Sequence, residues 1–344
     1  MAILRRLLSL TPLVLGVMLV LGAAGAQAGF PGQNGRIAFS DADADPGILT
    51  MNANGTGLLA TGEGSWPSWS ADGSEIAFES GGNIWTMNAN GTDRTQVTTL
   101  GGSWPTWSPD GTKIAFLSTR DNNYEIYRIN AGGTGEMNLT NHAMDDGYPA
   151  WSPDGTKIAF VSVRDGGSDI FVMNPDGSGP TNLTNGSGIN WMPDWSPDGA
   201  KIAMHSLRFP TSDDEVWVMN ADGTGLVNLT QSPETDRQPV WSPDGTKIAF
   251  LRVIEHNFDV YVMNANGTGQ ADITNTADVS EQRPSWQPIV APGPVGGISL
   301  DPTAGAQRAS GFGLGRWRLA GGGTALLFAL GVGFGLRRPA IVRR

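Results

Sequence analysis

The side chains most often used in catalysis are few in this chain and share no pattern. The sequence contains no cysteine, which excludes thiolate chemistry, disulfides and zinc–thiolate sites. Its three histidines, His142, His205 and His256, fall at different places relative to the repeated motifs, so we assign them to loops. No Gly-x-Ser-x-Gly nucleophile motif is present. We therefore expect no catalytic residues and predict that the protein is not an enzyme.

Acidic residues offer one candidate metal site. Asp41, Asp43 and Asp45 alternate along the chain as the oxygen ligands of a calcium loop do. However, Pro46 stands where such a loop needs glycine, and Asn52 stands where it needs glutamate. We expect these carboxylates to be solvated, with no bound metal and no cofactor. Calcium in this loop or in a central channel is the alternative.

The strongest candidates for ligand binding are large side chains that stand three or four residues before a repeated tryptophan. Aromatic and arginine side chains form the buried anchors of interfaces. The candidates vary between repeats, whereas the tryptophan is always present, so we assign the tryptophan to structure. The candidate binding residues are Trp66, Trp104, Tyr148, Trp191, Arg237 and Arg283. They come from the pairs Ser65-Trp66, Ser103-Trp104, Gly147-Tyr148, Trp191-Met192, Arg237-Gln238 and Gln282-Arg283.

A repeated motif must position these side chains. Three stretches read Trp-Ser-Pro-Asp-Gly-Thr-Lys-Ile-Ala-Phe and two more are looser copies: 107–116, 151–160, 241–250, 195–204 and 69–78. The tryptophans that begin the copies, together with Trp286, are 38, 44, 44, 46 and 45 residues apart. This period is typical of a four-stranded β-propeller blade.

Each unit reads as four antiparallel strands. Ser-Pro-Asp-Gly suits a type I turn with a glycine bulge, placed between a short strand ending in Trp and an Ile-Ala-Phe strand. An aromatic and β-branched strand, an Asn-Gly or Asp-Gly turn and a short Leu-Thr strand follow. Acids that open the third strands and methionines inside them also recur, so we assign both to structure: Glu125, Asp169, Glu215 and Asp259; Met51, Met87, Met173, Met219 and Met263.

The two ends of the repeat region carry complementary fragments. Residues 35–39 form a second strand without its tryptophan strand, and the strand ending in Trp286 lacks everything after it. Pairing the strand near Trp286 with the strands near Ile37 completes the sixth blade and closes the ring, because no blade can bury its faces alone. We therefore predict an all-β, six-bladed propeller of four-stranded antiparallel blades over residues 29–288, and a monomer.

The repeat also resembles a known family. In consensus form, Pro-x-Trp-Ser-Pro-Asp-Gly followed by Ile-Ala-Phe, Ile-Tyr-Val-Met-Asn and Leu-Thr looks like the WD-like repeat of TolB-type six-bladed β-propellers. The resemblance covers about residues 35–287 and implies the same fold. TolB proteins carry an α/β domain ahead of the propeller. Only residues 29–34 separate the leader from the first strand here, so we expect that domain to be absent.

The chain ends differ from the body in composition. Residues 1–28 have a basic start, an apolar run and a final Ala-Gln-Ala, as a secretory signal peptide does. Residues 289–315 are rich in Gly, Pro and Ala and predict a flexible tether. Residues 316–344 combine an apolar stretch with a basic end, which predicts a transmembrane or surface-sorting segment. An uncleaved N-terminal anchor and a soluble tail are the alternatives.

The body between the ends is strongly acidic. Residues 29–300 hold 13 Lys and Arg against 32 Asp and Glu, a formal charge of −19, which excludes nucleic acid as a partner. We predict an exported, membrane-tethered binding or scaffold module, at the cell surface or in the periplasm. Its channel mouth would recognise an envelope protein, peptide or glycan. The alternatives are a metal-dependent hydrolase or lactonase-like enzyme in the channel, and a structural surface protein without a ligand.

Overall fold

The computed structural model describes residues 32–41, 47–209, 213–274 and 281–290. The chain divides into two compact units, residues 1–293 and 294–344, and every described residue belongs to the first. The predicted signal peptide and C-terminal segment therefore lie outside the described residues, as does all but the start of the predicted tether. Within the described part, no helix is long and apolar enough to cross a membrane.

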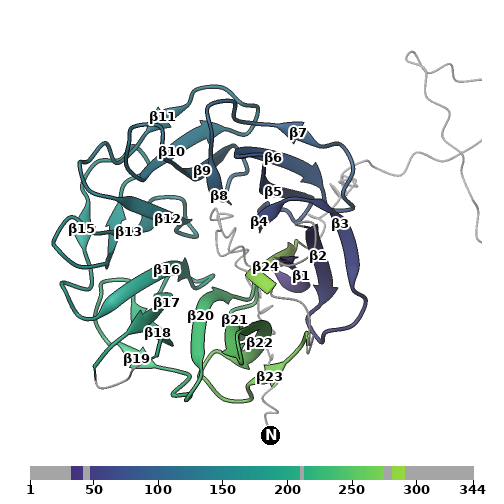
Figure 1. The fold of residues 1–344 in the computed structure, drawn as a ribbon, viewed down its shortest axis with the longest axis vertical. Helices are drawn as coiled ribbons and strands as arrows, with labels where there is room; N and C mark the ends of the chain where they lie inside the picture. The colour runs from purple at the N-terminus through teal and green to yellow at the C-terminus, as the bar shows by residue number, and fades with distance from the viewer. Residues whose placement is uncertain (1–31, 42–46, 210–212, 275–280, 291–344) are drawn as a thin grey trace, which may run out of the picture. The chain divides into compact units, whose positions relative to one another are not determined.

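Six four-stranded antiparallel sheets are arranged around a central axis (Figure 1). Five of them use consecutive strands, innermost first. Blade 2 consists of β4 (Ser65–Trp69), β5 (Glu75–Ser80), β6 (Asn83–Asn88) and β7 (Thr95–Gln96). Blade 3 consists of β8 (Ser103–Trp107), β9 (Lys113–Ser118), β10 (Glu125–Asn130) and β11 (Met137–Asn138). Blade 4 consists of β12 (Asp146–Trp151), β13 (Ile158–Ser162), β14 (Asp169–Met173) and β15 (Thr181–Asn182). Blade 5 consists of β16 (Ile189–Trp195), β17 (Lys201–Leu207), β18 (Glu215–Asn220) and β19 (Val227–Asn228). Blade 6 consists of β20 (Thr235–Trp241), β21 (Lys247–Ile254), β22 (Asn257–Asn264) and β23 (Ala271–Asp272).

Blade 1 is built from two distant parts of the chain. Its innermost strand is β24 (Glu281–Ile289), which is followed outward by β1 (Gln33–Asp41), β2 (Gly47–Asn52) and β3 (Leu59–Glu63). Strands β24 and β1 are antiparallel, with Ile37 opposite Trp286 and Ala38 opposite Ser285. This pairing confirms the predicted closure and the six-bladed fold.

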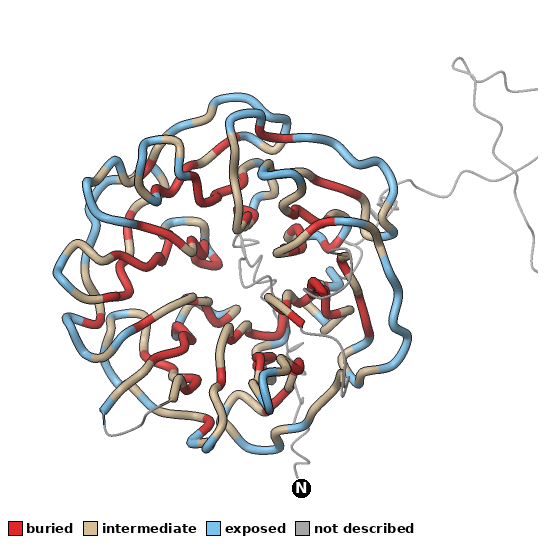
Figure 2. The backbone as a smooth tube through the Cα atoms, in the orientation of Figure 1, coloured by how far each residue is buried: buried red, intermediate tan, exposed pale blue. Residues whose placement is uncertain are grey.

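The core lies in layers between neighbouring blades. In one layer, Ala115 of blade 3 packs with Trp151, Ile158 and Phe160 of blade 4. The Ile and Phe of the second strands, or Ile202 and Met204 in blade 5, face one neighbouring blade, while the small Ala between them packs against the large residues of the other neighbour. Figure 2 shows these buried residues along the inner and middle strands, with the outer rim exposed. The third-strand methionines are also buried, as predicted.

Antiparallel pairing gives the ring two distinct faces. The Ser-Pro-Asp-Gly turns join the first and second strands on one face, which we call the turn face. In blade 4, Asp154 accepts hydrogen bonds from Ser152 Oγ at 2.6 Å and from Thr156 N at 3.0 Å, and Gly155 has a φ of 67°. The opposite face, where the innermost strands begin, is the mouth face.

The acids that open the third strands have the predicted structural role, through a partner inside their own blade. Asp169 Oδ1 accepts a hydrogen bond from Thr184 Oγ1 at 2.6 Å, and Glu125 accepts one from Thr140 in the same way. Each threonine follows the short fourth strand. These bonds therefore fix the outer edge of the sheet to its third strand on the mouth face.

Candidate binding site at the channel mouth

Every innermost strand contains, in its first four residues, a left-handed residue followed by a proline. This residue has a φ between 46° and 54° and lies at a register shift against the second strand. Such a β-bulge redirects a side chain, and a non-glycine residue at positive φ is strained. The bulge residues are Trp66, Trp104, Tyr148, Met192, Gln238 and Arg283, and the prolines after them are Pro67, Pro105, Pro149, Pro193, Pro239 and Pro284.

The bulges hold four of the six predicted binding residues: Trp66, Trp104, Tyr148 and Arg283. Trp191 and Arg237 lie one position earlier, in regular pairing with the second strand, and Met192 and Gln238 occupy the bulges of their blades. The predicted binding residue is the larger member of each pair before the tryptophan. In blades 5 and 6 that residue is one position before the bulge. The proline after each bulge residue is the sequence signal that marks it.

Four aromatic side chains from blades 2 to 5 form a continuous arc at the mouth. The Trp66 and Trp104 rings are stacked, with centroids 4.8 Å apart. Tyr148 meets Trp104 edge-on at 4.9 Å and Trp191 edge-on at 5.6 Å. Trp191 thus completes the arc although it lies outside the bulge. We call these four residues the aromatic arc.

Arg283, on strand β24 of blade 1, lies against this arc. Its guanidinium carbon is 5.1 Å from the Trp104 ring centroid, and Nη2 donates to Pro105 O at 2.9 Å. Its backbone N–H donates to Gln238 Oε1 at 2.8 Å, and its Nη1 finds no hydrogen-bond partner among the described residues. Burial lowers the pKa of Arg283 to about 10, so the side chain stays charged at neutral pH.

Asp194 supplies the opposite charge in the channel. The residues after the six prolines line the channel, and Asp194 is the one acid among them: Ser68, Thr106, Ala150, Asp194, Val240 and Ser285. Its Oδ2 accepts a hydrogen bond from Trp241 N at 2.7 Å. Burial raises the pKa of Asp194 to about 7, although the Trp241 bond and the charge of Arg283 act against this shift. Asp194 therefore titrates near neutral pH.

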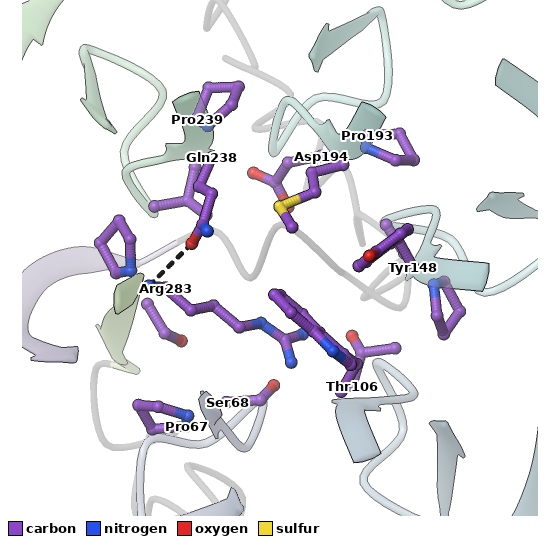
Figure 3. Close-up of a pocket in the computed structure, with 16 residues that line it drawn as sticks. Pro67, Ser68, Thr106, Tyr148, Pro193, Asp194, Gln238, Pro239 and Arg283 are labelled. Atoms are coloured by element: carbon purple, nitrogen blue, oxygen red, sulfur yellow. Dashed lines mark hydrogen bonds between the residues drawn. The ribbon is translucent and has the colours of Figure 1, made fainter. Parts of the chain in front are cut away.

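Two cavities meet at the aromatic arc. The axial cavity has a volume of about 100 Å³ and contains both Arg283 and Asp194, which face each other across the channel in Figure 3. The second, which we call the aromatic groove, has a volume of about 270 Å³ and is lined by all four residues of the arc together with Tyr124 and Asp145. Trp104 and Tyr148 line both cavities and form the wall between them.

Arg237 and His205 lie beside the mouth in blades 5 and 6. Arg237 Nε donates to Asp214 Oδ2 at 2.6 Å, and the arginine side chain is 43% exposed. The prediction that His205 lies in a loop is wrong. His205 occupies strand β17 and is buried, and its Nδ1 accepts a hydrogen bond from Gln238 N at 3.4 Å. Burial lowers the pKa of His205 to about 3, so it is neutral and a weak base.

Metal ligands do not gather in the described residues, where no three His, Asp or Glu side chains could hold one ion. Asp41 ends strand β1 and is buried, but Asp43, Asp45 and Pro46 of the candidate calcium loop lie outside the described residues. The site that the structure presents is therefore an aromatic surface with one arginine and one aspartate held at its centre.

Solved structures share this architecture. TolB from Acinetobacter baumannii superposes with a TM-score of 0.65 at 22% identity, covering 77% of this chain and 69% of that chain. A protein assigned as TolB from Agrobacterium tumefaciens gives 0.60 at 24% identity, covering 69% and 88%. Hydrazine synthase from Kuenenia stuttgartiensis gives 0.61 at 16% identity, covering 76% and 47%. At these identities the likeness shows the fold alone.

The family comparison rests on sequence rather than on superposition. A search among curated proteins found no match. A family model described as the TolB beta propeller domain matches residues 66–290, which span blades 2 to 6 and the closing strand β24. This match covers well over half of the chain, and the chain therefore belongs to the TolB β-propeller domain family.

Proposed function

We propose that this propeller is a non-catalytic binding module of the cell envelope, which holds a segment of a partner macromolecule on its mouth face. The aromatic arc is the observation that supports this most directly. Its four rings come from four blades, and three of them occupy strained bulges. Rigid aromatic side chains offer a large contact area with few rotatable bonds, which suits a binding surface.

The polar groups at the mouth favour recognition over chemistry. His205 lines a further cavity at the mouth together with Tyr148 and Trp191, and its low pKa makes it a poor general base. Arg283 is oriented by hydrogen bonds to Pro105 and Gln238, and Asp194 is oriented by its bond to Trp241. A fixed donor and a fixed acceptor inside an aromatic frame give a ligand its orientation.

We further propose that the protein is exported and tethered to a membrane. The composition of residues 1–28 and 316–344 supports this placement. Removing residues 316–344 should release the protein from the membrane fraction into the soluble exported fraction. Equal membrane association of the shortened and full-length chains would contradict the tether.

The binding proposal is tested with arrays of peptides and glycans probed by the full-length protein. We expect a defined set of probes to bind, and the double variant Trp104→Ala/Tyr148→Ala to lose them. The matched control is Asp154→Ala, which changes the turn face and leaves the mouth intact. Binding that survives the double variant, or that the control weakens equally, would contradict a ligand site at the mouth.

A further inference from the structure

The aromatic groove differs from the axial cavity in the charge of the groups that line it. The axial cavity contains a cation, Arg283, together with the carboxylate of Asp194, whereas the groove lies on the far side of Trp104 and Tyr148 and is lined by two carboxylates, Asp145 and Asp146, and by no lysine or arginine. The two cavities therefore suit ligand groups of different charge, even though they share a wall.

One of the two groove carboxylates has a nearby cation and the other does not. Asp146 is fully buried and pairs with Arg164 at 2.6 Å, so its charge is compensated inside the protein. Asp145 is exposed, and its Oδ1 accepts the backbone N–H of Tyr124 at 2.9 Å. No arginine or lysine forms an ion pair with Asp145 within the described residues. Asp145 therefore leaves a negative charge at the groove.

The remaining walls attract a cation as well. Aromatic ring faces draw ammonium and guanidinium groups, most strongly where water is excluded. The protein already shows this preference, because its own Arg283 lies over Trp104 from the axial side. Apolar side chains beside the groove, Tyr124 and Met144, are about half exposed and offer contact for neighbouring parts of a bound chain.

The wider surface has the same sign. Three further arginines of the mouth face, Arg164, Arg237 and Arg252, each form an ion pair with an aspartate. The formal charge of residues 29–300 is −19, so the body as a whole is acidic. An acidic field of this kind speeds the association of a basic partner.

We propose that the aromatic groove receives a lysine-type side chain from a basic segment of a partner polypeptide, with Asp145 as its counter-charge. The arc surrounds the alkyl stem and the ammonium group, and Asp145 accepts a hydrogen bond from that group at the rim. This inference rests on the proposed binding function and adds the chemical class of the ligand to it.

The test uses the full-length protein in detergent, with fluorotryptophan incorporated so that ¹⁹F NMR reports on the arc. The probes are two blocked tripeptides, Gly-Lys-Gly and Gly-Gln-Gly, and a neutral trisaccharide of N-acetylglucosamine. We expect the lysine peptide to bind about tenfold more tightly than the glutamine peptide. Asp145→Asn should remove most of this difference, whereas Asp154→Asn, the same change on the turn face, should preserve it.

Equal affinity for the two peptides, a difference unaffected by Asp145→Asn, or no binding of the lysine peptide would overturn the inference. Tighter binding of the trisaccharide would assign the groove to a neutral glycan instead. Because Asp145 is exposed, its variant is expected to fold, and thermal melting checks this. If the array ligands still require Trp104 and Tyr148, the binding function stands while the lysine assignment fails. If they require neither residue, both proposals fail.

Discussion

On the turn face, the same serine–aspartate hydrogen bond recurs from blade to blade. On the mouth face, the bulge residues of the six blades share their backbone geometry but vary in side chain. Five turns place a serine Oγ within 2.5 to 2.7 Å of an aspartate oxygen. The six mouth bulges share a positive φ but carry two tryptophans and one each of tyrosine, methionine, glutamine and arginine.

Carboxylates respond to the two faces in opposite ways. At the turn-face Asp154, burial acts to raise the pKa, but hydrogen bonds from Ser152 and Thr156 outweigh it and the pKa is lowered. At the mouth, burial prevails at Asp194 and raises its pKa to about 7. The turn aspartates are therefore arranged to stabilise the fold in the ionised form, while Asp194 is held where ionisation is unfavourable. This contrast between the two faces leads to four predictions.

The largest effect should come from opening the ring, on which both faces depend. A chain ending at residue 290 retains strand β24, and a chain ending at residue 280 lacks it. We expect the shorter chain to lose its cooperative thermal transition, because Ile37 and the neighbouring layers become exposed. Circular dichroism melting of the two chains measures this. Equal melting temperatures would show that closure by β24 is dispensable.

Two tryptophans on strand β8 compare the faces directly. Trp107 is 2% exposed in the core, whereas Trp104 is partly exposed at the mouth. We expect Trp107→Ala to lower the free energy of unfolding by about 3–5 kcal/mol, and Trp104→Ala to lower it by about 1 kcal/mol. Chemical denaturation gives both values. Similar losses would mean that the mouth tryptophan is as structural as the core one.

Asp194→Asn should change how stability depends on pH. The folded pKa of about 7 lies above the unfolded value, so protonation favours the folded state and the wild type gains stability as the pH falls from about 8 to 4. Asparagine retains an acceptor for Trp241 N and does not titrate. After allowance for solvent screening, we expect the variant to be more stable by about 1–2 kcal/mol at pH 8, with the advantage lost near pH 5. Parallel pH profiles would contradict the burial of this charge.

The smallest effect should come from a single turn. Asp154→Ala removes the bonds from Ser152 and Thr156, and because the turn is exposed we expect a loss of only about 0.5–1 kcal/mol at pH 7. Its folded pKa is lowered, so the wild-type advantage exists above the unfolded pKa and diminishes as the pH falls below that value through the lower folded pKa. Melting at neutral pH and at a series of acid pH values tests this. A loss that does not diminish in acid would point to a cause other than the carboxylate.

The sequence was most informative where structure depends on short-range patterns. The Ser-Pro-Asp-Gly turns and the Ile-Ala-Phe strands predicted the blade, and the incomplete repeats at residues 35–39 and 286 predicted the closure that pairs Ile37 with Trp286. Four of the six candidate binding residues proved to lie in the mouth bulges. The other two were displaced by one residue, because side-chain size carries no information about a bulge register.

Packing between blades decided what the sequence did not reveal. His205 reads as an ordinary polar residue, and only the contact between blades 5 and 6 makes it a buried, neutral acceptor for Gln238. In the same way, the recurrence of the third-strand acids indicated a structural role but not their partners, which are threonines of their own blade. Such partners are set by spatial proximity rather than by spacing along the chain.

Periodicity, turn chemistry and the two complementary chain ends determined the fold of this protein, because the turn and strand patterns act over a few residues and recur from blade to blade. The proposed binding surface arose only in the closed ring. There, Arg283 reaches Pro105 across 178 residues of chain, and four blades bring their aromatic side chains into contact. Curvature and closure set those distances, and no local pattern encodes the distances themselves.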